Sequence, residues 1–388
     1  ARACSGVGRM GSPPWRRGRG SGPQSVGHGA GGRDAASAGP AARWRKKGCY
    51  ILSRMSWTPG RVQGPRRILL IQLRRIGDAV LVTPALDALR AAWPEARLHL
   101  LTAAPVPQLF EGDARLERVW TRPSRLGLPA LAGALRREGF DLVFDFQSAP
   151  LTAILAAATG AFTVGFRRRW RPYRRAVDLR EHRGSHYAVD HKLDQLRAVG
   201  LAPTALHPRL APRAADLAPW NGLPAGPRVA LVPVSPWAHK RWSAEAFART
   251  ARLLHERTGA VFVVAGGPGE EPLLQAVSER LTNVPHRAQP FGPLRDLAAF
   301  LAGADLYLGN DNGPRHIALA LGLPTIARFS RDNPTHWTPP ADPRHPVIWD
   351  PSHVQGRPVR GDLVILPEDP AAVAQAAAEL LRAVEAGR

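Results

Sequence analysis

The sequence predicts an α/β protein made of two successive domains, each built from parallel βαβ units. Three observations predict this fold class. Short apolar runs alternate with amphipathic stretches of helical length, a stretch rich in Pro and Ala interrupts the alternation at residues 202–227, and the alternation then restarts. The length of 388 residues and the apolar fraction of 44% are sufficient for two hydrophobic cores. Two such domains in a row predict a ligand in the cleft between them.

The elements of the first domain, residues 61–205, follow from these runs. Apolar runs predict strands at residues 67–73, 98–102, 116–120, 141–145 and 162–165. Helical periodicity predicts helices at residues 79–93, 129–138, 151–158 and 186–199. Pro94 ends the first of these helices. We expect residues 206–227 to form the linker between the domains.

The second domain, residues 228–388, repeats the pattern. Strands are predicted at residues 228–233, 260–265, 305–308 and 325–329. Helices are predicted at residues 244–258, 269–281, 294–301 and 313–321, with a closing helix at 371–385. Because the strands are expected to be parallel, functional groups should gather where their carboxyl ends meet.

Residues 1–60 are predicted to be a disordered basic extension. Residues 1–54 contain eleven Lys and Arg but one acid, and so carry +10 of the net charge of +22. They lack strand or helix periodicity, and such a composition buries too little apolar surface to fold. Three interpretations of residues 1–54 are open: sequence that is not native to the folded protein, a basic arm that binds nucleic acid or anionic lipid, and a targeting peptide. The composition favours the first.

Composition also excludes two classes of protein. The chain has two cysteines, Cys4 and Cys49, too few for a scaffold held together by disulfides. It contains no uninterrupted apolar run of the length that a membrane-spanning helix needs.

The first stretch that could take part in binding or catalysis is RRIGD, residues 74–78, between the first strand and its helix. Gly77 permits a tight turn there, and Asp78 at the helix start can cap free N–H groups and favour the helix dipole. The alternative makes Asp78 a general base at the mouth of the cleft. A dinucleotide fingerprint needs three spaced glycines, and this loop has one, which disfavours a hydride-transfer enzyme.

The second stretch is SPWAHKRWS, residues 235–243, which leads from a strand to a helix capped by Ser243. Its hydroxyl, Lys and Arg side chains before a helix N-terminus suit a phosphate group. The alternative is a solvated basic loop with one packed Trp. Sequence alone leaves both open.

Two more loops lie between a predicted strand and helix in the second domain. In GGPGEE, residues 266–271, the glycines allow close approach of a ligand, and Glu270 or Glu271 could accept hydrogen bonds from ribose hydroxyls. In GNDNGPRH, residues 309–316, polar side chains and a helix N-terminus form an anion cradle, with His316 directed toward the same site. The structural alternatives are a plain helix start with acids in its first turn and an Asx-rich turn.

Read in order, these stretches resemble glycosyltransferase family 9, the heptosyltransferases of lipopolysaccharide core assembly. The resemblance covers about residues 66–382. It rests on the segments RRILLIQLRRIGDAVLVTPAL, FDLVFDFQSAP, HKRWSAEAFA, VVAGGPGEE and GADLYLGNDNGPRHIALALGLPT, with a weaker match at VILPEDPAAV. It implies a GT-B fold of two Rossmann-like domains with a cleft between them. It also implies transfer of heptose from an ADP-sugar, with inversion, on the cytoplasmic side of the inner membrane.

The resemblance assigns roles residue by residue. It implies that Asp78 is the base for the acceptor hydroxyl. If Asp78 is only a helix cap, Asp145 is the next candidate for the base. The donor-binding residues that it implies are Ser235 and Lys240 for the diphosphate, Glu270 for the ribose, and Asp311, Asn312, Gly313 and His316 for the donor sugar and phosphates. The residues on the acceptor side are Arg74, Arg75, Gly77 and Gln147. Family members usually have Thr at the position of Asn312.

This resemblance predicts an enzyme that needs neither cofactor nor metal, because Lys240 and helix N-termini can stabilise a leaving diphosphate. The chain contains no Asp-x-Asp, in keeping with a metal-independent site. The expected partners are the nucleotide-sugar donor, a lipid-linked saccharide acceptor and the anionic surface of the membrane, not nucleic acid. Two alternatives stay open: a GT-B transferase or epimerase that uses another nucleotide sugar, and a non-catalytic basic protein that binds nucleic acid or a membrane surface.

Overall fold

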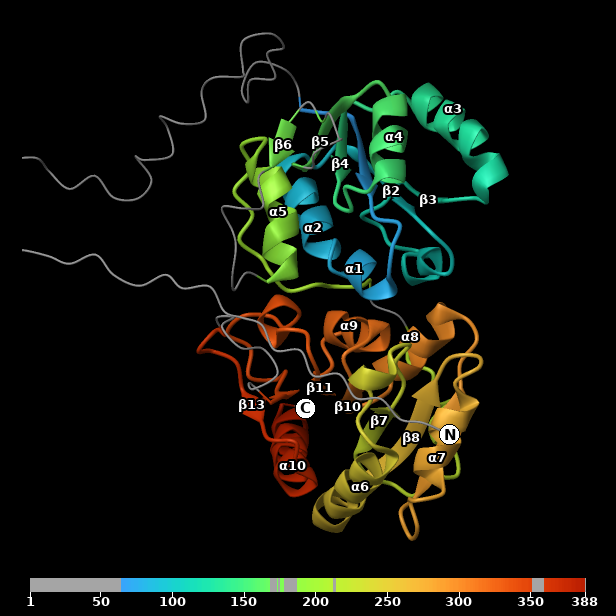
Figure 1. The fold of residues 1–388 in the computed structure, drawn as a ribbon, viewed down its shortest axis with the longest axis vertical. Coiled ribbons are helices and arrows are strands. Elements are labelled where there is room, and N and C mark those ends of the chain that lie inside the picture. The colour runs from blue at the N-terminus through green and yellow to red at the C-terminus, as the bar shows by residue number, and fades with distance from the viewer. Residues whose placement is uncertain are drawn as a thin grey trace, which may run out of the picture. The chain divides into compact units, whose positions relative to one another are not determined.

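The computed structural model describes residues 64–167, 173, 175–177, 187–211, 214–350 and 359–387, all within the compact unit Thr58–Arg388. The extension predicted at residues 1–60 lies outside the described residues. Two parallel sheets organise the unit, and Figure 1 shows helices packed along each of them. We call the residues of the first sheet and its helices the N-terminal half, and those of the second the C-terminal half.

The first sheet has the strand order β3-β2-β1-β4-β5-β6, and all its neighbours pair in parallel. Its strands are β1 (Arg67–Ile71), β2 (Arg97–Thr102), β3 (Arg118–Thr121), β4 (Leu142–Asp145), β5 (Phe162–Phe166) and β6 (Arg175–Val177). Its helices are α1 (Ile76–Val80), α2 (Thr83–Ala92), α3 (Leu128–Glu138), α4 (Pro150–Ala158) and α5 (Ala188–Arg197), with 3-10 turns η2 (Val106–Leu109) and η3 (Arg125–Gly127). The order reverses between β1 and β4, which makes the loop after β1 a preferred ligand position.

The second sheet has the order β13-β12-β11-β10-β7-β8-β9 and is also parallel. Its strands are β7 (Arg228–Val232), β8 (Val261–Gly266), β9 (His286–Pro290), β10 (Leu306–Asn310), β11 (Thr325–Arg328), β12 (Val347–Ile348) and β13 (Ile365–Leu366). Its helices are α6 (Ala244–Thr258), α7 (Glu271–Ser278), α8 (Leu294–Ala302), α9 (Gly313–Ala320) and α10 (Pro370–Ala386), with 3-10 turns η6 (Ala238–Lys240) and η7 (Pro334–His336). Here the reversal falls between β7 and β10.

The predicted α/β class with two Rossmann-like sheets is therefore confirmed. Apart from Arg67 at the start of β1, the residues of the central strands β1, β8 and β10 are buried, as expected for parallel strands covered by helices. A representative core cluster in the N-terminal half packs Leu69, Ile71 and Val143 of the sheet against Leu135 of α3 and Leu155 of α4.

One predicted helix is wrong in its extent. The helix expected at residues 79–93 begins earlier, at Ile76, and divides into α1 and α2. Pro84 explains the division, because proline has no N–H to donate to the carbonyl of Val80. The hydroxyl of Thr83 donates to that carbonyl instead, at 2.8 Å.

Sequence reasoning also missed the edge strands β6, β9 and β13, and β12 next to β13. These are short, and β9 (HRAQP) has no apolar run because most of its residues are exposed or half-buried at the sheet edge.

The Pro- and Ala-rich stretch before residue 228 contacts both halves and includes the 3-10 turn η5 (Ala218–Trp220). The amide of Arg209 donates to the Thr83 hydroxyl in the N-terminal half, and the amide of Leu210 donates to the Ala320 carbonyl in the C-terminal half. The domain boundaries stay predictions.

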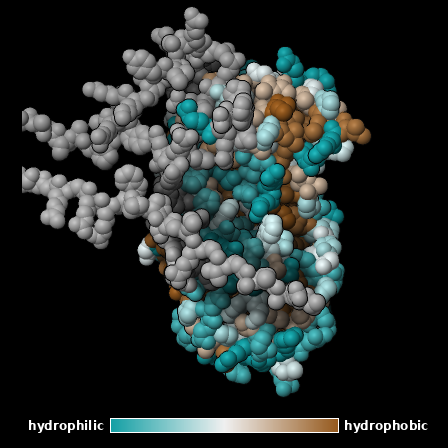
Figure 2. Space-filling view, in the orientation of Figure 1, coloured by the Kyte–Doolittle hydropathy of each residue, from teal (hydrophilic) through white to brown (hydrophobic). Residues whose placement is uncertain are grey.

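The surface view in Figure 2 shows hydrophobic residues gathered on the part of this face that belongs to the N-terminal half, while the C-terminal half is mainly hydrophilic. Leu126 in η3 and Ile154 in α4 are strongly exposed. Within the part of the chain that the structure describes, no helix combines the length and apolar character needed to cross a membrane.

Candidate functional site

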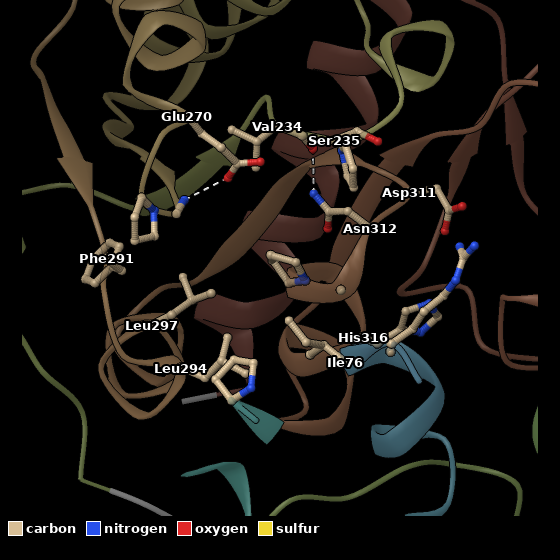
Figure 3. Close-up of a pocket in the computed structure, with 18 of the residues that line it drawn as sticks. Ile76, Val234, Ser235, Glu270, Phe291, Leu294, Leu297, Asp311, Asn312 and His316 are labelled. Atoms are coloured by element: carbon tan, nitrogen blue, oxygen red, sulfur yellow. Dashed lines mark hydrogen bonds between the residues drawn. The ribbon is translucent and has the colours of Figure 1, made fainter. Parts of the chain in front are cut away.

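A cavity of about 610 Å³ lies against residues from both halves. The N-terminal half contributes Arg75, the start of α1 and Pro105. The C-terminal half contributes the segments that follow β7, β8, β9 and β10, together with Trp337. Figure 3 shows side chains of the C-terminal half and Ile76 of α1 around it. The predicted site residues that line it are Asp78, Ser235, Lys240, Glu270, Asp311, Asn312, Gly313 and His316, together with Arg75 and Gly77. Arg74 and Gln147 are not among its lining residues.

Gln147 instead holds the loop after β1 by hydrogen bonds to its backbone. Its Oε1 accepts hydrogen bonds from the backbone amides of Leu73 and Arg74 at 2.8 and 2.7 Å. The tight conformation in this loop belongs to Arg75, whose φ is 57°, a value that few residues other than glycine adopt. The turn role predicted for Gly77 is therefore wrong.

Gly77 allows a close contact between the halves. It lies inside α1, and a Cβ added to it would lie 2.5 Å from Cδ2 of His316 in α9. Figure 1 shows α1 beside α9. The glycine thus lets the two helices that carry Asp78 and His316 approach each other.

Replacing Gly77 by Ala should destabilise the protein by about 1–3 kcal/mol, because the added methyl group overpacks a buried contact. His316 is buried, and its ring lies 6.0 Å from that of Trp337. We expect a lower melting temperature in calorimetry. Gly133→Ala is the matched control: Gly133 lies in α3, where a Cβ would meet only Arg137 Nη1 at 3.4 Å, and alanine should stabilise that helix slightly. A Gly77→Ala protein as stable as the wild type would contradict this assignment.

Asp78 is the third residue of α1, and its side chain is 24% exposed. The N-cap position of α1 receives no side-chain hydrogen bond, so the predicted capping role is not observed. The ammonium of Lys192 in α5 lies beside the carboxylate, with Nζ 4.0 Å from Asp78 Oδ1. Asp78 thus lines the cavity from a short helix.

Asp145, the alternative base, does not line this cavity. It is fully buried and accepts hydrogen bonds from the Ser148 amide at 2.8 Å and the Tyr173 hydroxyl at 2.7 Å. Burial raises the pKa of Asp145, and these hydrogen bonds oppose that rise. Its contacts are those of a structural residue.

Lys240, in η6 after β7, binds two carboxylates. Its Nζ lies 2.9 Å from Asp311 Oδ2 and also pairs with Asp332. Burial disfavours the ammonium, but the two acids outweigh burial, so the pKa of Lys240 lies above its ordinary value. Asp332 could not be predicted from the sequence, because its partner Lys240 lies far away along the chain.

The polar residues at the end of β10 are largely engaged in holding the loops. Asn312 caps α9: its Oδ1 accepts from the Arg315 amide at 3.0 Å, and its Nδ2 donates to the Val234 carbonyl at 2.8 Å. Asn310 Nδ2 donates to the Pro233 carbonyl at 2.8 Å. The two amides therefore tie the start of α9 to the loop after β7, and they place the N-terminus of α9 at the cavity.

His316 in α9 is buried, and its Nδ1 has no hydrogen-bond partner among the described residues. Burial, aided by Arg315 and Lys240, lowers the pKa of His316 to about 3. The imidazole is therefore neutral near pH 7. The neighbouring Arg315 points elsewhere, donating to the Trp337 carbonyl and the Thr338 hydroxyl at 3.0 Å each.

An apolar wall completes the cavity beside Glu270. Glu270 Oε2 accepts from the Gly267 amide at 2.8 Å, and Figure 3 shows Phe291, Leu294 and Leu297 on the same side of the cavity. Sequence reasoning missed these three residues: Phe291 follows the unpredicted edge strand β9, and Leu294 and Leu297 lie in α8, where apolar residues indicate only a packed helix. Ser235 is buried, and its Oγ accepts from the Trp237 amide at 3.4 Å.

Two doubly wound sheets with a shared cavity at their switch points are typical of the GT-B fold. The model of glycosyltransferase family 9 (heptosyltransferase) matches residues 129–358. The chain belongs to this family, so the resemblance and the class of enzyme are confirmed, and a non-catalytic binding protein is disfavoured.

Known proteins agree with this assignment. The lipopolysaccharide core heptosyltransferase OpsX of Haemophilus influenzae is 22% identical over 300 residues, which cover 71% of this chain and 82% of that protein. A family 9 glycosyltransferase from Veillonella parvula has a similar structure, with a TM-score of 0.68, 22% identity, and coverage of 82% and 97% of the two chains. The ADP-heptose heptosyltransferase II of E. coli gives a TM-score of 0.66, with 19% identity and coverage of 82% and 99%. These structural likenesses support the fold.

Proposed function

We propose that the protein is an inverting heptosyltransferase that moves heptose from an ADP-sugar to a lipopolysaccharide core acceptor. One observation carries the proposal: a carboxylate from the N-terminal half, Asp78, shares a cavity with the polar loops of the C-terminal half. Support for the sugar and acceptor comes from family membership and from the heptosyltransferase relatives.

The loops of the C-terminal half suit a nucleoside diphosphate. The ammonium of Lys240 and the N-terminus of α9 supply positive charge for the diphosphate. The carboxylate of Glu270 can accept hydrogen bonds from ribose hydroxyls, and the apolar wall of Phe291, Leu294 and Leu297 suits a flat base. The neutral imidazole of His316 lines the cavity, where it can hydrogen-bond to the sugar or the phosphates.

The reaction then needs one displacement. Asp78 takes the proton of the acceptor hydroxyl while the hydroxyl oxygen attacks the anomeric carbon of the donor sugar. The bond between that carbon and the diphosphate oxygen breaks, and its electron pair stays on the diphosphate. Lys240 and α9 stabilise this charge, so we propose a reaction that needs no metal. A single attack from the face opposite the leaving group inverts the anomeric centre.

The acceptor is proposed to be a lipid-linked saccharide. Such an acceptor would bring the enzyme to the anionic inner face of the membrane, where the basic net charge favours it. The structure of the described residues is compatible with peripheral contact through exposed Leu126 and Ile154.

Nucleotide preference tests the donor class. Calorimetry should show that ADP binds at least about tenfold more tightly than UDP, a difference of about 1.4 kcal/mol. Equal binding or a preference for UDP would instead favour the alternative, a GT-B enzyme that uses another nucleotide sugar.

A further inference from the structure

Lys192 is a buried cation outside the donor-binding loops. It lies in α5, and its side chain is 8% exposed. An ammonium group loses favourable hydration when it is buried, and a buried lysine therefore needs compensating partners. Burial lowers the pKa of Lys192, while the charges of Asp78 and Asp145 oppose that lowering. The proposed displacement uses Asp78 and leaves this cation without a role.

The contacts of Lys192 direct its ammonium to the end of β1 and the start of α1. Nζ donates to Gln72 Oε1 at 2.9 Å and lies 4.0 Å from Asp78 Oδ1. It also lies 6.0 Å from the centre of the Phe146 ring. Gln72 is fixed in turn, since its Nε2 donates to the Arg74 carbonyl at 3.2 Å.

Asp78 needs such a partner because its own helix restrains it weakly. The helix α1 is five residues long and has no side-chain cap. A carboxylate at its start can rotate unless a neighbouring charge fixes it. Lys192 approaches Oδ1, which leaves Oδ2 for the acceptor proton.

We infer that Lys192 is a positioning residue: its ammonium holds the Asp78 carboxylate in the orientation that accepts the proton of the acceptor hydroxyl. This inference rests on the proposed function. It assigns to α5 a part in the chemical step, although Lys192 itself does not line the cavity.

A double-mutant cycle tests the inference. Lys192→Met keeps the length and packing of the side chain and removes its charge. It should lower kcat about 10- to 100-fold, because the Asp78 carboxylate would no longer be held in position to accept the proton. The KM for the donor and the affinity for ADP should stay near wild type. In an Asp78→Asn background the same change should cause no further loss, because Lys192 acts through Asp78.

A second variant covers the case in which Lys192→Met folds poorly. Gln72→Glu places a carboxylate where Oε1 already meets the ammonium, and so draws Lys192 away from Asp78. It should lower kcat in the same direction. Asp190→Asn is the control on the same helix, where Asp190 pairs with Arg197 at 2.7 Å, and its kcat should stay near wild type.

Two results would overturn the inference: an unchanged kcat in Lys192→Met and Gln72→Glu, or an equal loss of kcat from Lys192→Met with and without Asp78. Failure of the proposed function looks different. In that case Asp78→Asn alone would keep the wild-type kcat.

Discussion

Asp78→Asn should lower turnover by about 10²–10⁴-fold while the melting temperature and the ADP affinity barely change. The amide keeps the shape of the side chain but cannot take the proton of the acceptor hydroxyl. Asp78 makes no capping hydrogen bond in α1 and is partly exposed. Its ion-pair partner, the buried Lys192, keeps its hydrogen bond to Gln72 and the nearby charge of Asp145 in the variant, so the loss of the 4.0 Å contact should lower the melting temperature only slightly.

Asp145→Asn is the matched control for this prediction. Asp145 is buried and accepts hydrogen bonds from backbone and Tyr173, so the amide should lower the melting temperature and leave the rate per folded molecule largely intact. The reverse pattern, in which Asp78→Asn unfolds early and keeps its rate while Asp145→Asn loses turnover, would make Asp145 the base.

Lys240→Met should weaken ADP binding by about 10- to 100-fold, since a charge-assisted contact contributes about 1.5–3 kcal/mol. Asp332→Asn should act in the opposite direction. The Asp332 side chain is 43% exposed and pairs with the ammonium that the diphosphate would use. Removing its negative charge should therefore tighten ADP binding.

Calorimetry with ADP measures both variants of this pair, and thermal unfolding shows whether the buried Asp311, left without Lys240, costs stability. Unchanged ADP affinity in Lys240→Met would remove Lys240 from the donor site. Weaker binding in Asp332→Asn would mean that Asp332 helps to hold the donor.

The local signals in the sequence predicted most of the fold. The predicted helix at residues 244–258 has the observed bounds of α6, because Ser243 accepts from the Ala246 amide at its start and Gly259, with φ of 68°, ends it. The helix break at Pro84 was not predicted, although proline has no N–H to continue the helix. The edge strand β9 was not predicted because an edge strand needs no apolar run.

The candidate site was predictable where its residues follow strands directly. Loops at the carboxyl ends of central parallel strands converge, so Asp78, Lys240, Glu270 and His316 reach one cavity. Partners from distant parts of the chain were not predictable. Lys192 lies far from Asp78 in sequence, and only the folded chain shows that Gly77 serves the contact with His316. The roles of these residues in binding and catalysis stay predictions.

The most direct test of the central claim is the structure of the product. The protein would be incubated with ADP-heptose and a core lipid truncated before its heptose residues, and the lipid analysed by mass spectrometry and by NMR of the new anomeric centre. We expect a lipid enlarged by one heptose, with the anomeric configuration opposite to that of the donor and one ADP released per transfer. A product with retained configuration, or transfer from a UDP-sugar but not from ADP-heptose, would contradict the account.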